Sequence, residues 1–442
     1  MRSTIFAFLL ALAFVLPLPA WAQTLAYKAG KSDSADPGRF GAAQAIEPAE
    51  PINLDAAIRL ALDSNPELSA AERELAALEA SITQASARPN PEIAALLEDT
   101  LTTTRTTTLQ VNQPLELGGK RAARIEAAER GRDVASAERD AKRAEIRAAV
   151  RAAFYDVLAA QERLRIAQAS VELAQSVTTT ASRRVAAGKV SPVEETKARI
   201  AEAGVRVEST LAASEIASAR KRLASLWGNP APRFERAEGD LEALPPLPAI
   251  ADLNARLRAS PSLVRAQIEV ERKAALAKVE RSRAVPNVTV SLGAKRDEEL
   301  GRDQAIFGVS IPIPVFDRNQ GNLLEALHRV DKARHELSAA ELRLSDELAL
   351  AYERLNAARG EAESLRNNIL PGAQSAFNAA SKGFELGKFS FLDVLDAQRT
   401  LFHAKSQYLR ALAETHRSAA EIERVLGSAT PDPSPAPTAD KP

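Results

Sequence analysis

The feature that most constrains this chain is residues 120–187, a stretch of about 68 residues with no proline and no chain-breaking cluster. As one α-helix, at about 1.5 Å per residue, it would form a rod about 100 Å long. No globular core needs such a helix. The sequence therefore predicts a protein built on long helical rods.

Apolar and small residues recur along this stretch at alternating steps of four and three, which is the heptad pattern of a coiled coil. A second stretch, 320–387, carries a related pattern, and Pro371-Gly372 should bend it. The first seam is Ile146, Val150, Ala153, Val157, Ala160, Leu164, Ala167, Val171, Ala174, Thr178, Ala181 and Val185. The second is Leu348, Tyr352, Leu355, Ala362, Ile369, Ala373, Ala376 and Ala380.

Proline and glycine landmarks repeat in order at a separation of about 198 residues. Asn65-Pro66 corresponds to Ser260-Pro261, Pro89-Asn90 to Pro286-Asn287, and Gly188-Lys189 to Gly387-Lys388. Chance similarity between Ala-rich helices is the alternative, but proline and glycine are not typical of helix composition. The sequence predicts an internal two-fold repeat, 52–228 and 252–427, joined by a Pro-rich linker, 229–251.

Each repeat has the pattern of a helix, two strands, a very long helix, a tight turn and another helix. The first helix is expected from Asn53, a cap candidate, to Arg88. Strands are expected at 93–99 and 109–117, and with clearer alternation at 288–294 and 307–315. Four strands are too few to close a membrane barrel, so closure would need further copies of the chain. A small exposed hairpin on a soluble protein is the alternative.

The two ends of the chain have distinct composition. Residues 1–22 have a basic start, an apolar run and Ala20-Trp21-Ala22, as in a cleaved signal peptide. A membrane-anchoring helix is the alternative, but eleven apolar residues fall well short of the roughly 20 that a span requires. An extended N-terminal linker, 23–51, and a Pro-rich disordered tail, 428–442, complete the predicted organisation.

Composition excludes several classes of function. The chain has 58 basic and 58 acidic residues, so no net charge gathers nucleic acid. It has no cysteine and four histidines, and His328 and His335 lack a third ligand nearby, which disfavours a bound metal or other cofactor. A periplasmic hydrolase would need a convergent acid and base, and no candidate pair stands out. The sequence therefore predicts a protein that is not an enzyme.

Three motifs resemble the TolC-like outer-membrane efflux proteins, and within them the heavy-metal branch that handles cobalt, zinc and cadmium or copper and silver. They are 117–121 (LGGKR), 312–321 (PIPVFDRNQG) and 391–399 (FLDVLDAQR). The resemblance covers about 52–426. It implies a mainly α-helical protein with a membrane β-barrel, in which a homotrimer closes a 12-stranded barrel above a coiled-coil tunnel in the periplasm.

The resemblance also implies a periplasmic gate. Asp393 and Asp396 match the paired carboxylates of the constriction, and Glu194 matches an acid of the closed-state latch. Six acids in a trimer would attract cations, and their crowding would raise some of the pKa values. Phe384 and Phe389 stand where the Tyr and Arg of that latch are expected, so the same polar bonds cannot form. The alternative is that the acids are solvated and stabilise a helix N-terminus.

The tight turns resemble the tips that meet a periplasmic adaptor protein, although ordinary helix capping explains the same residue types. The tip residues are Gly188, Lys189, Ser191, Gly387, Lys388 and Ser390. The implied function is a passive outer-membrane duct, set in outer-membrane lipid, that receives substrates, heavy-metal cations among them, from the adaptor and an inner-membrane RND pump. A soluble periplasmic coiled-coil scaffold, and a duct for drugs or secreted proteins, are the alternatives.

Overall fold

The computed structural model describes residues 47–386 and 388–427. The predicted signal peptide, most of the N-terminal linker, the C-terminal tail and Gly387 lie outside these residues. The chain is mainly helical and divides into two units. Glu74–Ala135 and Ala266–Leu337 form the strand unit, and 47–73, Ser136–Arg265 and 338–427 form the helical unit.

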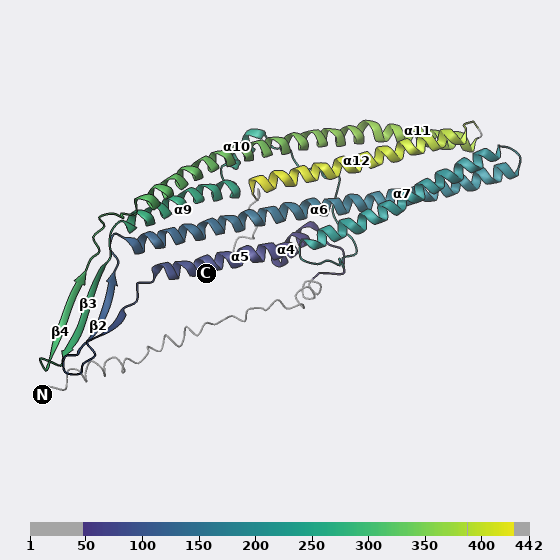
Figure 1. The fold of residues 1–442 in the computed structure, drawn as a ribbon. Coiled ribbons are helices and arrows are strands. Elements are labelled where there is room, and N and C mark those ends of the chain that lie inside the picture. The colour runs from purple at the N-terminus through teal and green to yellow at the C-terminus, as the bar shows by residue number, and fades with distance from the viewer. Residues whose placement is uncertain (1–46, 387, 428–442) are drawn as a thin grey trace, which may run out of the picture. The chain divides into compact units, whose positions relative to one another are not determined.

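The same order of elements occurs in each half of the chain (Figure 1). The first half contains α4 (Leu54–Ser64), α5 (Pro66–Ser86), β1 (Glu92–Glu98), β2 (Thr106–Leu115), α6 (Lys120–Ala186) and α7 (Pro192–Ser225). The second contains α8 (Ile250–Leu257), α9 (Pro261–Arg283), β3 (Val288–Asp297), β4 (Arg302–Ser310), α10 (Gln320–Ser364), the π-helix η1 (Leu365–Ile369), α11 (Leu370–Glu385) and α12 (Phe391–Leu426). No helix within 47–386 or 388–427 is both long and apolar enough to cross a membrane.

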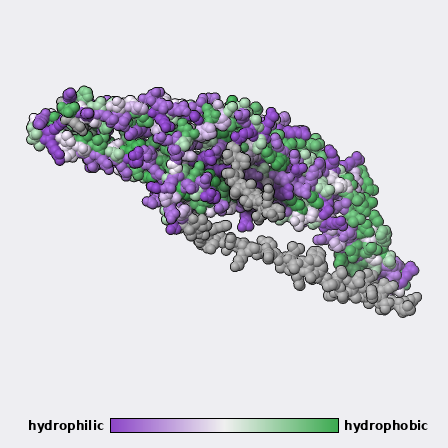
Figure 2. Space-filling model, turned by 180° about the vertical axis from the view of Figure 1, so that it is seen from behind, coloured by the Kyte–Doolittle hydropathy of each residue, from purple (hydrophilic) through white to green (hydrophobic). Residues whose placement is uncertain are grey.

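The strand unit contains one antiparallel sheet of order β1-β2-β3-β4. Ile93, Val111, Leu292 and Phe307 are cross-strand partners, so one exposed apolar row runs across all four strands on one face. The adjacent row, on the opposite face, is polar or small: Glu92, Asn112, Ser291 and Gly308. Figure 2 shows hydrophobic side chains gathered over the strands. The two edge strands of the sheet are β1 and β4.

The last strand begins and ends five residues earlier than the sequence predicts. β4 ends at Ser310, opposite Thr289, and residues 311–315 form no strand. Pro312 and Pro314 have no N–H to donate to a ladder. The predicted extension of β4 through Val315 is therefore wrong, although the alternation of apolar residues continues through it.

A glycine turn joins β2 to α6 in the strand unit. Gly118 adopts φ +70°, and a Cβ placed on it would lie 2.7 Å from Cβ of Val285. Lys120 Nζ donates to Asn287 Oδ1 at 2.5 Å, and Arg124 pairs with Glu116. The motif at 117–121 thus folds as a tightly packed turn from strand to helix.

The first predicted helix, 53–88, is two helices. Asn53 caps α4 as expected, accepting a hydrogen bond from Ala56 N at 2.9 Å. Asn65, however, has an extended backbone before Pro66, and its side chain accepts from Leu68 N at 3.0 Å. Proline disfavours helical backbone in the preceding residue, which ends α4 there. The corresponding break before Pro261 separates α8 from α9.

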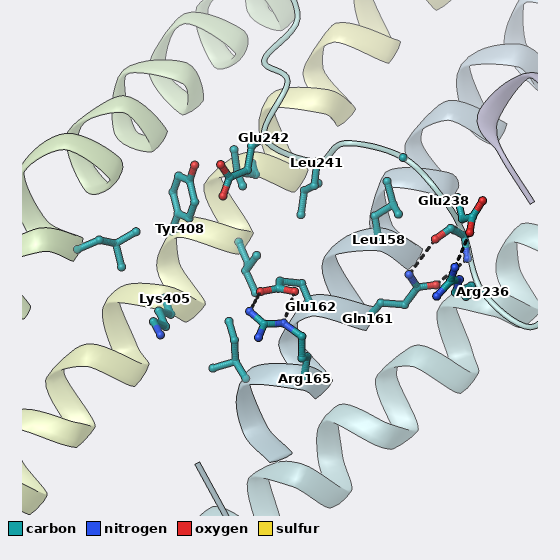
Figure 3. A pocket seen from close by; sticks show the side chains of 16 residues that line it. Leu158, Gln161, Glu162, Arg165, Arg236, Glu238, Leu241, Glu242, Lys405 and Tyr408 are labelled. Carbon is teal, nitrogen blue, oxygen red and sulfur yellow. Dashed lines mark hydrogen bonds and ion pairs between the residues drawn. The ribbon is translucent and has the colours of Figure 1, made fainter. Parts of the chain in front are cut away.

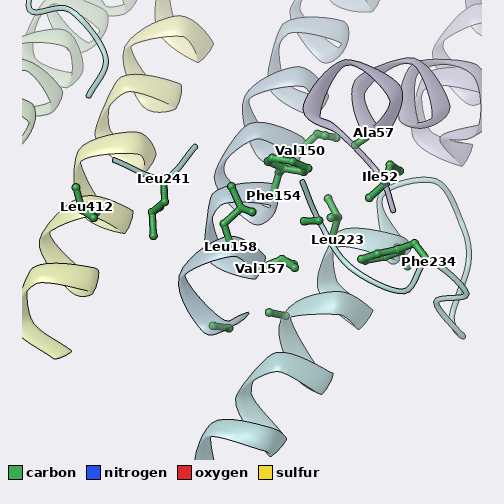
Figure 4. Packing of buried hydrophobic residues seen from close by; sticks show 14 of the residues in the cluster. Ile52, Ala57, Val150, Phe154, Val157, Leu158, Leu223, Phe234, Leu241 and Leu412 are labelled. Atoms are coloured by element: carbon green, nitrogen blue, oxygen red, sulfur yellow. The ribbon is translucent and has the colours of Figure 1, made fainter. Parts of the chain in front are cut away.

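The core of the helical unit packs α4, α6, α7 and α12 around the 226–241 segment (Figure 4). Trp227, Phe154 and Phe234 are fully buried in it. The carboxylate of Glu47 accepts hydrogen bonds from Trp227 Nε1 at 3.1 Å and from Phe234 N at 3.1 Å. The core therefore ties the start of the described chain to the 226–241 segment.

The predicted seam of α6 is the packed face of that helix, since none of its residues is exposed. The second seam is partly wrong. Ile369 and Ala376 are exposed, and after Leu365 the packed face continues at Leu370, Ala373 and Phe377. The step of five across η1 is the extra residue of a π-helical turn, which shifts the register after that point.

Candidate functional site at the helical tips

The first tip turn connects α6 to α7 in the helical unit. Gly188 adopts φ +67° and its N–H donates to Val185 O at 2.9 Å, while Lys189 N donates to Arg184 O at 2.9 Å. These bonds satisfy the last carbonyls of α6. Ser191 then caps α7, accepting from Val193 N at 3.3 Å. Gly188, Lys189 and Ser191 are exposed.

The second tip turn connects α11 to α12. Lys388 N donates to Gly383 O at 2.8 Å, and the ring of Phe389 lies against Gly383, where any Cβ would clash with it. Lys388, Phe389 and Ser390 are exposed. Gly387, the counterpart of Gly188, lies outside the described residues.

Asp393 is bound within the second turn. Its Oδ2 accepts hydrogen bonds from Ser390 N and Ser390 Oγ, both at 2.8 Å, and Ser390 Oγ accepts from Asp393 N at 3.4 Å. This is a capping box. The hydrogen bonds from the Ser390 side chain and backbone lower the pKa of Asp393. Within one chain the pKa of Asp393 is thus lowered. The predicted rise in pKa would come from the crowding of acids from three copies of the chain.

Asp396 and Glu194 are placed differently. Asp396 is exposed one turn further along α12, and Glu194 is half-buried in the first turn of α7. Among residues 47–386 and 388–427, no hydrogen bond or ion pair joins Glu194 to either aspartate. Its neighbour Glu195 makes the contact between helices instead, accepting from Ser182 Oγ of α6 at 3.1 Å. Within the described part of one chain, the three acids are therefore not among any group of three candidate metal ligands.

Phe384 is buried and Phe389 is half exposed, so the two phenylalanines have different surroundings. The guanidinium carbon of Arg184 lies 4.2 Å from the centroid of the Phe384 ring, and Arg184 Nη2 donates to Phe384 O at 2.9 Å. Phe384 belongs to a buried cluster that brings together α6, α7, α11 and α12 through Ala181, Ala198, Ala380 and Val394.

Arg184 was not predicted as a site residue. Its partner lies 200 residues away, close to the predicted repeat distance of about 198 residues, so alignment of the two predicted repeats could have suggested the contact. That alignment places α6 and α11 at the same level relative to the tips. Nothing in the residue pattern, however, distinguishes this arginine from its neighbour Arg183 as the one that faces the second half of the chain.

A cavity of about 780 Å³ lies further from the tips within the helical unit (Figure 3). Its charged lining is largely paired: Arg165 with Glu162, and Arg236 with Glu238. Gln161 donates to Ala237 O at 3.0 Å and accepts from Ala237 N at 2.7 Å. Gln161 thus joins the linker to α6, whereas the two ion pairs lie within α6 and within the linker.

Histidines do not form a metal centre in the part of the chain that the structure describes, which contains no group of three candidate ligands. His328 and His335 are exposed on α10. His416 is buried, its ring stacked on Tyr155 with 3.5 Å between centroids, and its Nε2 lies 3.0 Å from Leu241 O. Burial lowers the pKa of His416.

Comparison with curated proteins finds close relatives. The chain is 50% identical over 381 residues to the cobalt-zinc-cadmium resistance protein CzcC of Cupriavidus metallidurans, covering 86% of this chain and 91% of that protein. It is 29% identical over 284 residues to the nickel and cobalt resistance protein CnrC of the same species, covering 63% of this chain and 67% of that one.

Solved structures share the fold. CusC, whose structures concern transmembrane channel formation, matches with a TM-score of 0.73 at 20% identity, over 85% of this chain and 92% of that chain. The open state of the MtrE outer membrane channel of Neisseria gonorrhoeae matches with a TM-score of 0.71 at 21% identity, over 85% and 88%.

The family model described as outer membrane efflux protein matches residues 57–229 and 253–428. These matches include both tip turns and all four strands. They confirm the resemblance that the three sequence motifs indicated. The chain belongs to the outer membrane efflux protein family.

Proposed function

We propose that this chain is the outer-membrane channel of a tripartite efflux system and passively conducts heavy-metal cations out of the periplasm. The observation that carries this proposal is the 50% identity to a cobalt-zinc-cadmium resistance protein over 91% of its length. An efflux channel needs no catalytic site, which agrees with the prediction that the chain is not an enzyme.

The sheet supports a membrane position. Its apolar row, from Ile93 to Phe307, suits lipid, and the opposite row, from Glu92 to Gly308, suits a water-filled lumen. Strand edges cannot be left open in lipid. Three copies joined through β1 and β4 would close a 12-stranded barrel, with the helices of the three copies forming the periplasmic tunnel. On this proposal, residues 1–22 are an export signal that is removed, and the two matched halves of the chain descend from one duplicated unit.

The tips would form the periplasmic entrance. Asp393 and Asp396 are exposed on α12, so three copies would place six carboxylates around the opening. Rings of acids favour cations. Gly188, Lys189 and Ser191, with Lys388, Ser390 and Gly387, would meet the periplasmic adaptor, and an inner-membrane RND pump would supply the energy. Glu194, Phe384 and Phe389 would line or support the gate.

Metal accumulation tests the proposal. A strain that keeps the adaptor and pump but lacks this chain should accumulate zinc, cobalt or cadmium, measured by elemental mass spectrometry, and restoring the chain should reverse it. Accumulation of drugs with unchanged metal content would favour a duct for drugs. Recovery of the chain in the soluble periplasmic fraction would favour the coiled-coil scaffold.

A further inference from the structure

We propose that Arg184 is a gating residue: its contact with Phe384 holds the α6 tip against the α11 tip and keeps the entrance closed. The inference rests on the proposed channel function and names how the gate of that channel is held. It assigns a role to a residue outside the acids and phenylalanines that the family resemblance indicated.

Arg184 and Phe384 form a contact with two parts, which we call the clamp. The guanidinium covers the Phe384 ring, 4.2 Å from its centroid, and at the same time donates to the Phe384 carbonyl at 2.9 Å. A cation over an aromatic face is attracted by the ring quadrupole, and the attraction strengthens where water is excluded. Phe384 is buried and Arg184 half-buried, so the clamp is largely shielded from solvent.

The clamp lies where the two halves of the chain come together at the tips. Arg184 precedes the first turn by four residues and accepts, through its own carbonyl, the bond from Lys189 N that closes that turn. Phe384 lies on the last turn of α11, directly after Gly383, whose carbonyl accepts from Lys388 N of the second turn. Separation of the tips would therefore have to break the Arg184 contact.

Other polar groups at the tips are engaged locally. Asp393 is held by Ser390 of its own turn. Glu195 binds Ser182 and Arg199, which lie on the α6–α7 hairpin. Among the described tip residues, Arg184 joins the first hairpin to the second through its hydrogen bond to the Phe384 carbonyl.

Planar-bilayer conductance tests the clamp. Arg184→Gln removes the cation, and Phe384→Leu removes the ring but keeps the backbone carbonyl. Each should raise the open probability of the reconstituted trimer by at least about tenfold, because the cation–π contact is lost in each of three chains. Arg183→Gln is the matched control, because Arg183 is the exposed neighbour on the same helix turn. It should leave the open probability unchanged.

Equal open probability in the wild type and Arg184→Gln would overturn the clamp while leaving the channel proposal intact. If neither the wild-type trimer nor any of the variants conducts, the channel proposal itself is contradicted. The two failures are thus distinguishable.

Spin labels give a second measurement that needs no conductance. The chain has no cysteine, so Lys189→Cys and Lys388→Cys can be labelled one on each tip turn. Labelled chains are mixed with an excess of unlabelled chains, so that each trimer contains at most one labelled chain. Double electron–electron resonance should then show a narrow distribution of the distance between the two labels in the wild type. Arg184→Gln should lengthen and broaden it, and Arg183→Gln should not. Identical distributions in all three proteins would overturn the clamp.

Discussion

Arg184 on α6 lies over the ring of Phe384 on α11 and donates to the carbonyl of the same residue at 2.9 Å. The two residues belong to different halves of the chain, 200 positions apart. Phe384 has no hydroxyl with which to form a polar latch, and the arginine instead uses the face of its ring. The contact therefore provides an interaction between the hairpins that does not depend on a carboxylate.

The acids at the tips should set ion selectivity. We expect Asp393→Asn combined with Asp396→Asn to lower the preference for cations over anions, because the variant removes six negative charges from the trimer. The reversal potential under a salt gradient measures this preference. The exposed acid Glu353, outside the tips, provides the control Glu353→Gln, which should leave the reversal potential unchanged. Unchanged selectivity in the double variant would exclude these acids from the pore.

Acid should weaken the second tip turn. The pKa of Asp393 is lowered by its bonds to Ser390, so its stabilising contribution is complete above its usual value of 3.8 and is lost as the pH falls through the folded value. Between pH 5 and pH 2, the backbone amides of 388–396 should lose less protection from hydrogen exchange in Asp393→Asn than in the wild type. Identical acid profiles for the two proteins would contradict this assignment.

His416 should make the helical unit sensitive to mild acid. Burial lowers its pKa below 6.5, so the unfolded chain binds more protons between the folded and unfolded values, and stability must fall as the pH drops below about 6.5. The ring faces Tyr155 and the Leu241 carbonyl, with Arg151 and Asp240 as charged neighbours. His416→Phe should flatten the slope of melting temperature against pH between 7 and 5, whereas His403→Phe, at an exposed site on the same helix, should keep it.

Two adjacent glycines separate backbone strain from close packing. Gly118 and Gly119 have φ +70° and +72°, but a Cβ would clash with Val285 only at Gly118. Both alanine substitutions carry the left-handed backbone cost of about 1–2 kcal/mol. Gly118→Ala adds an overpacking cost of about 1–3 kcal/mol. We expect Gly118→Ala to lower the melting temperature and the trimer yield more than Gly119→Ala; equal losses would show that only backbone strain matters there.

Long periodic elements could be predicted from the sequence, and local departures could not. The 67-residue helix α6 begins and ends within one residue of its expected bounds, because glycines flank it and its heptads are uninterrupted. The π-turn at Leu365–Ile369 was missed, since its extra residue changes the register without changing the composition. The break at Asn65 was missed although Pro66 is a local signal for it; the side-chain bond from Asn65 to Leu226 O, 161 residues away, is what no local pattern records.

The candidate site was predicted less completely than the fold. Capping by Ser191 and Ser390 follows from residue type and position, and both bonds are present. The Arg184 contact depends on which side of α6 faces the second half of the chain, and that side is the one that packs around Ala181 and Ala380. Residue spacing within one repeat contains no such information.

Electron cryomicroscopy of the purified, detergent-solubilised protein tests the central claim most directly. We expect particles with three-fold symmetry, in which three sheets join β4 to β1 of the next copy and surround a lumen that continues between the helices. A monomer, or an assembly with no continuous lumen between its copies, would contradict it.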